Sequence, residues 1–372
     1  MAAALKSILG VLGGISRCSL QVLAPPGRGS GLSVSIGAAA VYLFLAGFFI
    51  SCDDKDPPHA NHISIETGNM VFFLNEGNFR WGNADLGLIN LRSGLSDPRF
   101  YKTHTGQTLG DVLQSATFWN NAWYLVLNNS GRIQPLSSLD LKPQTAITGL
   151  TSPRYLCPVS SSLAYVSDLY ANGIWKLRAG ASRPEKKIQL SGWTEEMVFA
   201  EGKLWVLNRK RPMLYGLNPE TDTWTDSIAL PSNGGCLAAG TPGQLWVSTD
   251  SSHGKLPALF RLHLASRNLS KVWEASDKLA FPSQMQSSIT GDTLYFLHKG
   301  LCRLLKASNE FYRFPLAGNN WYGLGYDPVR GQIWLSDAHD YVQNARILQL
   351  TAAGNVVKEW KGGPITSRFY FW

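Results

Sequence analysis

The sequence predicts an all-β protein: a seven-bladed β-propeller over residues 65–372, in which a C-terminal strand closes the first blade. Three observations lead to this prediction. The 372 residues are 44% hydrophobic and only 16% charged, which is enough apolar material to bury a large core. The chain contains 13 Trp, 13 Tyr and 36 Gly but no long amphipathic helical stretch, which favours strands and turns. The third observation is an internal repeat.

The repeat is an aromatic residue inside a short apolar run that ends in a small polar residue. Consecutive copies are spaced by 52, 41, 40, 41, 49 and 39 residues, close to the ~40–50-residue period of propeller blades. Further strand-like segments follow each copy, so each unit has four strands, and we expect inserted loops in the two longest spacings. The aromatic residues of the repeat are Phe72, Tyr124, Tyr165, Trp205, Trp246, Tyr295 and Trp334.

The two ends of the predicted propeller complement each other. The first unit lacks an opening strand, whereas the chain ends in an unassigned strand, Ser367 to Trp372. We therefore predict that the C-terminus supplies the inner strand of the first blade, which closes the ring and removes open sheet edges.

The N-terminal region has the organisation of an export signal. An uncharged apolar run over residues 33–50 follows three basic residues and precedes Cys52, an order that predicts a lipoprotein-type signal peptide over residues 1–51. Cys52 is then the lipidated residue that anchors the protein to a membrane, and residues 52–64 form an acidic tether. A transmembrane helix is the alternative, because 18 apolar residues are near the lower limit for spanning a bilayer.

Charge and cysteine content narrow the function classes. The formal net charge of +8 comes without a large basic block, and the densest run is Arg209 to Arg211, so we expect no nucleic-acid partner. Cys157, Cys236 and Cys302 lie in predicted strands at wide spacings. They are interpreted as small buried side chains rather than disulfide or metal residues.

Polar and aromatic residues collect in the loops that join the second to the third strand of a unit and one unit to the next. In a propeller these loops share one face around the central channel, and amides with aromatic rings suit a large, partly polar ligand. Turn formation is the alternative role for any single Asn or Asp. The predicted ligand-binding residues are Asn75, Glu76, Asn78, Trp81, Asn129, Arg154, Tyr155, Asp168, Tyr170, Arg209, Gln284, Trp321, Tyr322, Asp337 and His339.

Catalytic signatures are scarce. The sequence has no P-loop, no H-E-x-x-H, no C-x-x-C and no G-x-S-x-G, so we expect no enzyme, no catalytic residue, no metal ligand and no cofactor. A metal held in the channel by carboxylates is the alternative, and Glu76, Asp168, Glu195 and Asp337 are its candidate ligands.

Three segments carry a family resemblance: Phe72 to Leu91, Leu109 to Ile133 and Ile147 to Leu177. They resemble Bacteroidetes surface lipoproteins of the YncE-like β-propeller type, a group that includes the BtuG-like cobalamin-binding proteins. The acidic run Asp53 to Asp56 resembles the export signal of such lipoproteins, with a plain solvated tether as the alternative. The resemblance implies a lipid-anchored protein of the outer membrane, exposed on the cell surface, that binds cobalamin or another corrinoid and passes it to a TonB-dependent outer-membrane transporter. A lactonase-like hydrolase and a protein-interaction scaffold are the alternative functions.

Overall fold

Strands make up most of the regular structure in residues 63–372, the part of the chain that the computed structural model describes. The aromatic residue of every repeat is buried, with at most 5% of its surface exposed, because the run around it packs on both faces. The predicted signal peptide, the lipidation site Cys52 and most of the tether lie outside the described residues. Among the described residues, no helix is long and apolar enough to cross a membrane.

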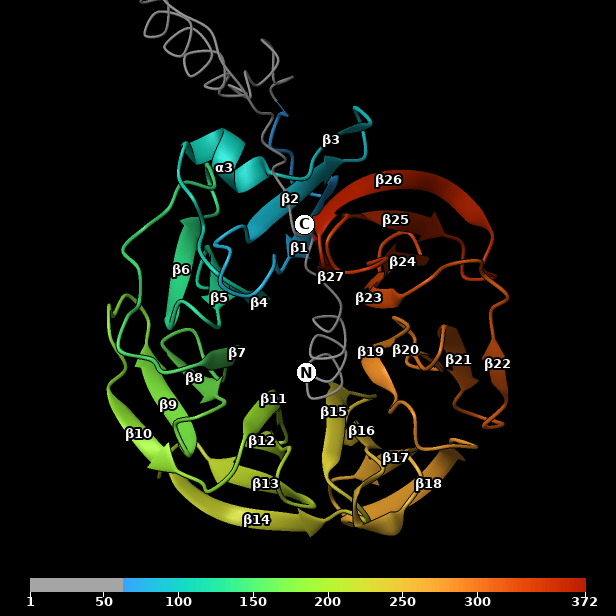
Figure 1. Ribbon diagram of the computed structural model, residues 1–372. Coiled ribbons are helices and arrows are strands. Elements are labelled where there is room, and N and C mark those ends of the chain that lie inside the picture. Colours follow the sequence, from blue (N-terminus) through green and yellow to red (C-terminus); the bar gives the residue numbers. More distant parts are fainter. Residues whose placement is uncertain (1–62) are drawn as a thin grey trace, which may run out of the picture. The chain divides into compact units, whose positions relative to one another are not determined.

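The strands form six hydrogen-bonded sheets, which follow one another around a ring (Figure 1). Four sheets have four strands each. The first two contain β7 (Pro153–Pro158), β8 (Leu163–Asp168), β9 (Gly173–Arg178) and β10 (Lys186–Gln189), then β11 (Thr194–Ala200), β12 (Lys203–Asn208), β13 (Met213–Asn218) and β14 (Thr223–Ala229). The next two contain β15 (Gly234–Ala239), β16 (Gln244–Thr249), β17 (Ala258–His263) and β18 (Asn268–Glu274), then β19 (Ser283–Ser287), β20 (Thr293–Leu297), β21 (Leu301–Leu305) and β22 (Phe311–Arg313).

The largest of these sheets has eight strands, so the prediction of seven separate four-stranded sheets is wrong. It consists of two antiparallel groups of four that are joined by one parallel contact, Leu324 with Arg368. That contact forms because the innermost strands of the two groups run side by side near the centre. One group contains β1 (Met70–Asn75), β2 (Asp85–Asn90), β3 (Leu95–Asp97) and β27 (Thr366–Phe371), and the other β23 (Trp321–Asp327), β24 (Gln332–Asp337), β25 (Asn344–Leu350) and β26 (Val356–Pro364).

The C-terminal strand closes the ring. β27 pairs antiparallel with β1 from Val71↔Phe371 to Asn75↔Thr366, which confirms the role predicted for the end of the chain. Beyond this ladder, Met70 and Trp372 exchange two backbone hydrogen bonds of 2.9 Å. The edge of β1 that faces the ring's centre is therefore paired along its length.

The remaining sheet has three strands, β4 (Leu113–Trp119), β5 (Ala122–Leu127) and β6 (Arg132–Ser137), where four were predicted. The missing strand lies beside β6 but contributes only two isolated bridges, Ile133↔Ile147 and Leu136↔Pro143. Pro143 has no backbone donor, and the Gln134 side chain donates to the Gln144 carbonyl at 2.7 Å. The segment still shares backbone hydrogen bonds with β6, such as Gln144 N–H to the Pro135 carbonyl at 2.9 Å, but they do not form a regular strand ladder.

Both long repeat spacings contain inserted structure. The helix α3 (Phe100–Thr105) lies between β3 and β4, and the short 3-10 turn η1 (Ser252–Gly254) lies between β16 and β17. The cysteines Cys236 and Cys302 are buried and Cys157 is half-buried, and all three are free thiols.

Candidate functional site

The strands nearest the ring's centre (Figure 1) share one irregularity close to their first residues. In each, the register with the neighbouring strand shifts, which is the mark of a β-bulge. A bulge breaks the strict alternation of side chains between the two faces of a strand and changes the direction in which its own side chains point. The residues inside these shifts are Gln114, Arg154, Tyr155, Glu195, Glu196, Gly235, Cys236, Gln284, Met285, Tyr322 and Ser367.

Buried serines at the ends of the repeated runs secure two of these bulges. Ser248 Oγ accepts the Cys236 N–H and donates to the Pro282 carbonyl, each at 2.7 Å. Ser336 Oγ accepts the Gly323 N–H at 2.9 Å and donates to the Thr366 carbonyl at 2.6 Å. Each hydroxyl therefore ties a bulge to the start of the innermost strand in the next group, which explains the serine in these two copies of the repeat.

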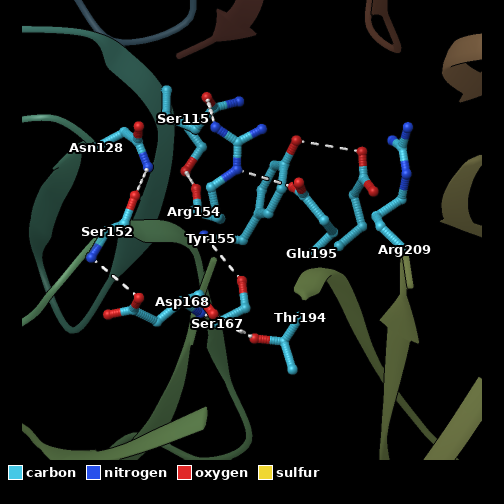
Figure 2. A network of polar contacts seen from close by, with 12 residues as sticks. Ser115, Asn128, Ser152, Arg154, Tyr155, Ser167, Asp168, Thr194, Glu195 and Arg209 are labelled. Carbon is cyan, nitrogen blue, oxygen red and sulfur yellow. Dashed lines mark hydrogen bonds and ion pairs between the residues drawn. The ribbon is translucent and has the colours of Figure 1, made fainter. Parts of the chain in front are cut away.

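Eight of the bulge residues, together with Glu76, Arg209 and Arg368, make up what we call the central polar cluster. Its members are Glu76, Gln114, Arg154, Tyr155, Glu195, Glu196, Arg209, Cys236, Gln284, Tyr322 and Arg368. Figure 2 shows its Arg154 end, where Nε donates to Glu195 Oε2 at 2.9 Å and Nη1 donates to Gln114 Oε1. The Glu195 side chain is 8% exposed, so this charged hydrogen bond is largely shielded from water.

Arg368 connects strands that are not neighbours in the ring. Its Nη2 donates to the Tyr155 hydroxyl at 2.6 Å and lies 3.7 Å from Glu196 Oε1. Tyr155 in turn donates to Glu196 Oε1 at 3.2 Å, and the Cys236 thiol donates to the same oxygen at 3.5 Å. These contacts join β27 to β7, β11 and β15, so side chains bridge the ring's centre at this level.

Elsewhere in the cluster, the Tyr322 hydroxyl donates to Glu76 Oε2 at 3.1 Å. Arg209 donates to the Gly235 carbonyl at 2.9 Å, and its guanidinium lies 4.6 Å from the centre of the Phe281 ring. With Arg154 and Arg368, the cluster holds three guanidinium groups and the three carboxyl groups of Glu76, Glu195 and Glu196.

Burial controls the protonation of these groups. It raises the pKa of Glu76 against the opposing effect of Arg154, and together with the charge of Glu195 it raises the pKa of Glu196. Burial also raises the pKa of the Tyr155 and Tyr322 phenols well above the usual value. The two phenols therefore stay protonated and act as hydrogen-bond donors to carboxylates.

A rim of exposed aromatic residues lies in the loops at the same end of the strands. Trp81 is 66% exposed, Tyr170 58%, Phe79 47% and Tyr341 41%. Asn78 Nδ2 donates to the Tyr341 carbonyl at 2.7 Å, which connects two of these loops. The Tyr341 ring also meets the Tyr322 ring edge-on, with centroids 5.5 Å apart, so the rim contacts the central polar cluster.

Several predicted ligand-binding residues instead hold loops together. The Asp168 carboxylate accepts the backbone N–H groups of Thr151 and Ser152 at 2.9 and 3.0 Å. Asp337 accepts those of Asn319, Asn320 and His339, and Asn75 bonds Pro98, Gly363 and Thr366. Short polar side chains commonly accept loop N–H groups in this way. This is the turn-forming role that the sequence offered as the alternative for single Asn and Asp residues.

Three other predicted residues are also constrained. Asn129 donates to Asp111, and His339 Nδ1 lies 3.7 Å from Asp337 Oδ2. Trp321 is half-buried: it packs against the core cluster of Leu324 and Leu335, and the Arg346 guanidinium lies 5.7 Å from its ring centre. The predicted role of Trp321 as a ligand-binding residue stays a prediction.

The structure also separates the carboxylates of the metal alternative. Glu76 and Glu195 belong to the central polar cluster, whereas Asp168 and Asp337 are directed into loop backbones. Within residues 63–372, no group of three or more His, Cys, Asp or Glu side chains is arranged to hold a metal ion.

The sequence matches one protein family over most of its length, residues 69–371. That family is described as "Domain of unknown function (DUF5074)". The chain belongs to this family. The DUF5074 match begins one residue before β1 and ends with the last residue of β27, so it spans the whole ring. No curated protein matches the sequence.

Solved structures show that the DUF5074 domain is a β-propeller. A quinoprotein alcohol dehydrogenase-like protein from Bacteroides thetaiotaomicron is 12% identical with a TM-score of 0.65, and the match covers 82% of this chain and 78% of that one. A Lactobacillus plantarum protein is 10% identical with a TM-score of 0.63, covering 82% and 99%. The periplasmic gluconolactonase of Pseudomonas aeruginosa is 13% identical with a TM-score of 0.61, covering 81% and 98%. At sequence identities this low, the similarity shows a shared fold and nothing about function.

Sequence reasoning missed several members of the central polar cluster in this DUF5074 chain, namely Gln114, Glu196, Cys236 and Arg368. All four lie in opening strands that the sequence identified, at or next to the second residue of the strand. Aligning those strands on their first residues would have brought these positions together, because the bulge recurs at the same place.

Proposed function

We propose that this protein is a surface lipoprotein that captures a large, partly polar solute on the aromatic rim and does not transform it. One observation carries the proposal: Trp81, Tyr170, Phe79 and Tyr341 are exposed on loops above a cluster whose polar groups are mostly paired. Aromatic rings with two side-chain torsions bind large areas at a small entropic cost.

The hydrogen bonding of the cluster's carboxyl groups supports binding of a solute rather than its chemical conversion. In the central polar cluster, the carboxylates of Glu76, Glu195 and Glu196 each accept a hydrogen bond from an arginine or tyrosine. Carboxyl groups engaged in this way are held in fixed positions as structural hydrogen-bond acceptors. Such groups are better suited to orienting a bound solute than to acting on it as a nucleophile or a base.

A corrinoid is the solute we propose to test first. Its ring is large and edged with amides, so flat aromatic side chains and hydrogen-bonding groups together complement it. The family resemblance in the sequence favours the same ligand class. On this proposal Cys52 carries the lipid anchor at the outer membrane, and a TonB-dependent transporter receives the solute.

We also propose that the ring has seven blades. The interrupted register recurs at the inner strands β4, β7, β11, β15, β19, β23 and β27. Each of these strands opens one structural unit. The eight-stranded sheet then counts as two blades in contact through Leu324 and Arg368.

The test is calorimetric titration of the full-length chain in detergent with cyanocobalamin. We expect saturable binding that weakens at least tenfold in the double variant Trp81→Ala/Tyr170→Ala, because truncating a buried aromatic contact costs about 1–3 kcal/mol. Phe199→Ala is the matched control, since Phe199 is 39% exposed near the opposite end of β11.

Two results would contradict this proposal. Absence of binding heat would refute the corrinoid ligand, and unaltered affinity in the double variant would refute the assignment to the rim. A parallel assay of gluconolactone hydrolysis, with and without Ca²⁺, tests the lactonase-like alternative. Metal-dependent turnover there would replace capture with hydrolysis.

A further inference from the structure

A cavity of about 590 Å³ lies between the group of strands β1 to β3 and the edge strand β26. β1 and β2 both contact β26 there (Figure 1), and the Gly363 N–H of β26 donates to Asn75 Oδ1 of β1 at 2.9 Å. No residue of the central polar cluster lines this cavity. Its volume is within the range of small-molecule sites, ~300–1,000 Å³, so it is a second candidate site.

Asp85 lines the cavity although only 7% of its surface is exposed. Its Oδ1 accepts the N–H groups of Tyr101 and Lys102 at 3.0 and 3.4 Å. Burial raises the pKa of Asp85 to about 7, and the charge of Asp97 acts in the same direction. At neutral pH a large fraction of the molecules therefore has an uncharged carboxyl here, which can donate a hydrogen bond.

Two lysines line the same cavity from different elements, Lys102 from α3 and Lys361 from β26. Both are exposed, and neither ammonium group forms an ion pair or a hydrogen bond with another residue between 63 and 372. The other charged residues of the lining are Arg99 and Asp97, besides Asp85. Three cations thus accompany two carboxyl groups, one of them partly neutral, and this excess of positive charge favours an anion.

Uncharged polar side chains complete the lining. The Asn344 amide and the Thr108 hydroxyl are exposed, and neither bonds another side chain or backbone group of residues 63–372. An amide or a hydroxyl offers both donors and acceptors, as the hydroxyl groups of a ligand do. The cavity therefore suits a ligand that combines a negative charge with hydroxyl groups.

We infer that this cavity binds a small hydroxylated organic anion, a sugar acid or an anionic sugar ester, whose negative group is attracted by Lys102 and Lys361. The site is separate from the aromatic rim, and the inference does not rest on the proposed function. It gives Asp85 the role of a hydrogen-bond donor to the bound anion.

Binding should then depend on pH, because an ionised Asp85 would repel the anion. With a pKa of about 7, the protonated fraction of Asp85 falls about tenfold between pH 6 and pH 8. The affinity should fall by the same factor, since only the protonated form is competent to bind. The other charged or titratable side chains around Asp85 are Asp97, Arg99, Tyr101, Lys102 and Lys361.

The experiment is calorimetric titration of the full-length chain in detergent with methyl glucuronoside, glucose 6-sulfate and neutral methyl glucoside. We expect at least one of the two anions to bind tenfold or more tightly than methyl glucoside, and the tighter one identifies the preferred anionic group. Lys102→Gln/Lys361→Gln should weaken its binding at least tenfold. The matched control is Lys255→Gln/Lys278→Gln, which removes the same charge at exposed positions outside the cavity and should leave the affinity unchanged.

A pH series with the tighter anion tests the role of Asp85, because neither anion changes its own charge between pH 6 and pH 8. The wild-type affinity should fall about tenfold over this range, and that of Asp85→Asn should stay constant. Binding of all three sugars alike, or of none, overturns the inference. Equal weakening in the two lysine pairs also overturns it, because it would show a general attraction to the protein's positive charge. The lysine pairs decide the matter even if Asp85→Asn does not fold.

Discussion

Replacing Ser336 with alanine removes one hydroxyl that bonds two backbone groups at the closure of the ring. Ser336 is fully buried, and its Oγ bonds the Gly323 N–H and the Thr366 carbonyl. Each of the two groups left without a partner costs about 1–3 kcal/mol, so we expect Ser336→Ala to lower the free energy of unfolding by about 2–6 kcal/mol. With an unfolding entropy of about 2.1 cal/mol/K for each of the 310 described residues, the melting temperature falls by about 3–9 °C.

The assay is differential scanning calorimetry together with urea unfolding followed by tryptophan fluorescence. Ser248→Ala removes the equivalent bonds elsewhere in the ring and should behave alike. Ser308→Ala, at an exposed position, provides the control. If Ser336→Ala melts within 1 °C of the wild type, water satisfies the two backbone groups and the serine does not link the blades.

Two further predictions concern buried charge. Burial raises the pKa of Asp85 to about 7, well above its value in the unfolded chain, so its contribution to stability is complete below about pH 4 and is lost as pH rises towards 7. Urea unfolding of Asp85→Asn should therefore vary less between pH 4 and 7 than the wild type, by up to about 4 kcal/mol, and parallel curves would contradict the raised pKa. Arg368→Met leaves Glu196 and Tyr155 without their shared partner and should cost about 3–5 kcal/mol in urea unfolding, whereas a loss below about 1 kcal/mol would show that Arg209 suffices for Glu196.

The fold was accessible from the sequence because its repeat is carried by buried aromatic residues such as Tyr165 and Trp334, which must recur wherever a blade packs. The closing strand was accessible for the same reason: one unit lacked a strand and the chain ended in one. The sequence did not predict that the groups ending in β23 and β27 join into one sheet, since this depends on a single parallel contact between the two strands.

The site was only partly accessible. The loops with Trp81 and Tyr170 were identified, because exposed aromatic residues beside turn formers are visible in a sequence. The structural role of Asp168 and Asp337 was not accessible, because a carboxylate that caps backbone N–H groups and one that awaits a ligand have the same sequence context, and their binding role stays a prediction. Arg368 was missed because only the closing strand brings it to Tyr155, 213 positions earlier in the chain.

The pairing of β1 with β27 also sets an order of events during synthesis. Val71 and Phe371 are partners although 300 positions separate them, so the ring cannot be completed until β27 has been translated. Until then, one edge of β1 is an open template for other strands, and such edges recruit intermolecular partners. Contacts this distant in sequence also form slowly. Translation that stops before β27 therefore yields a chain with nearly all of its blades and an exposed strand edge, so this six-residue strand decides whether the chain forms a closed ring or is prone to aggregate.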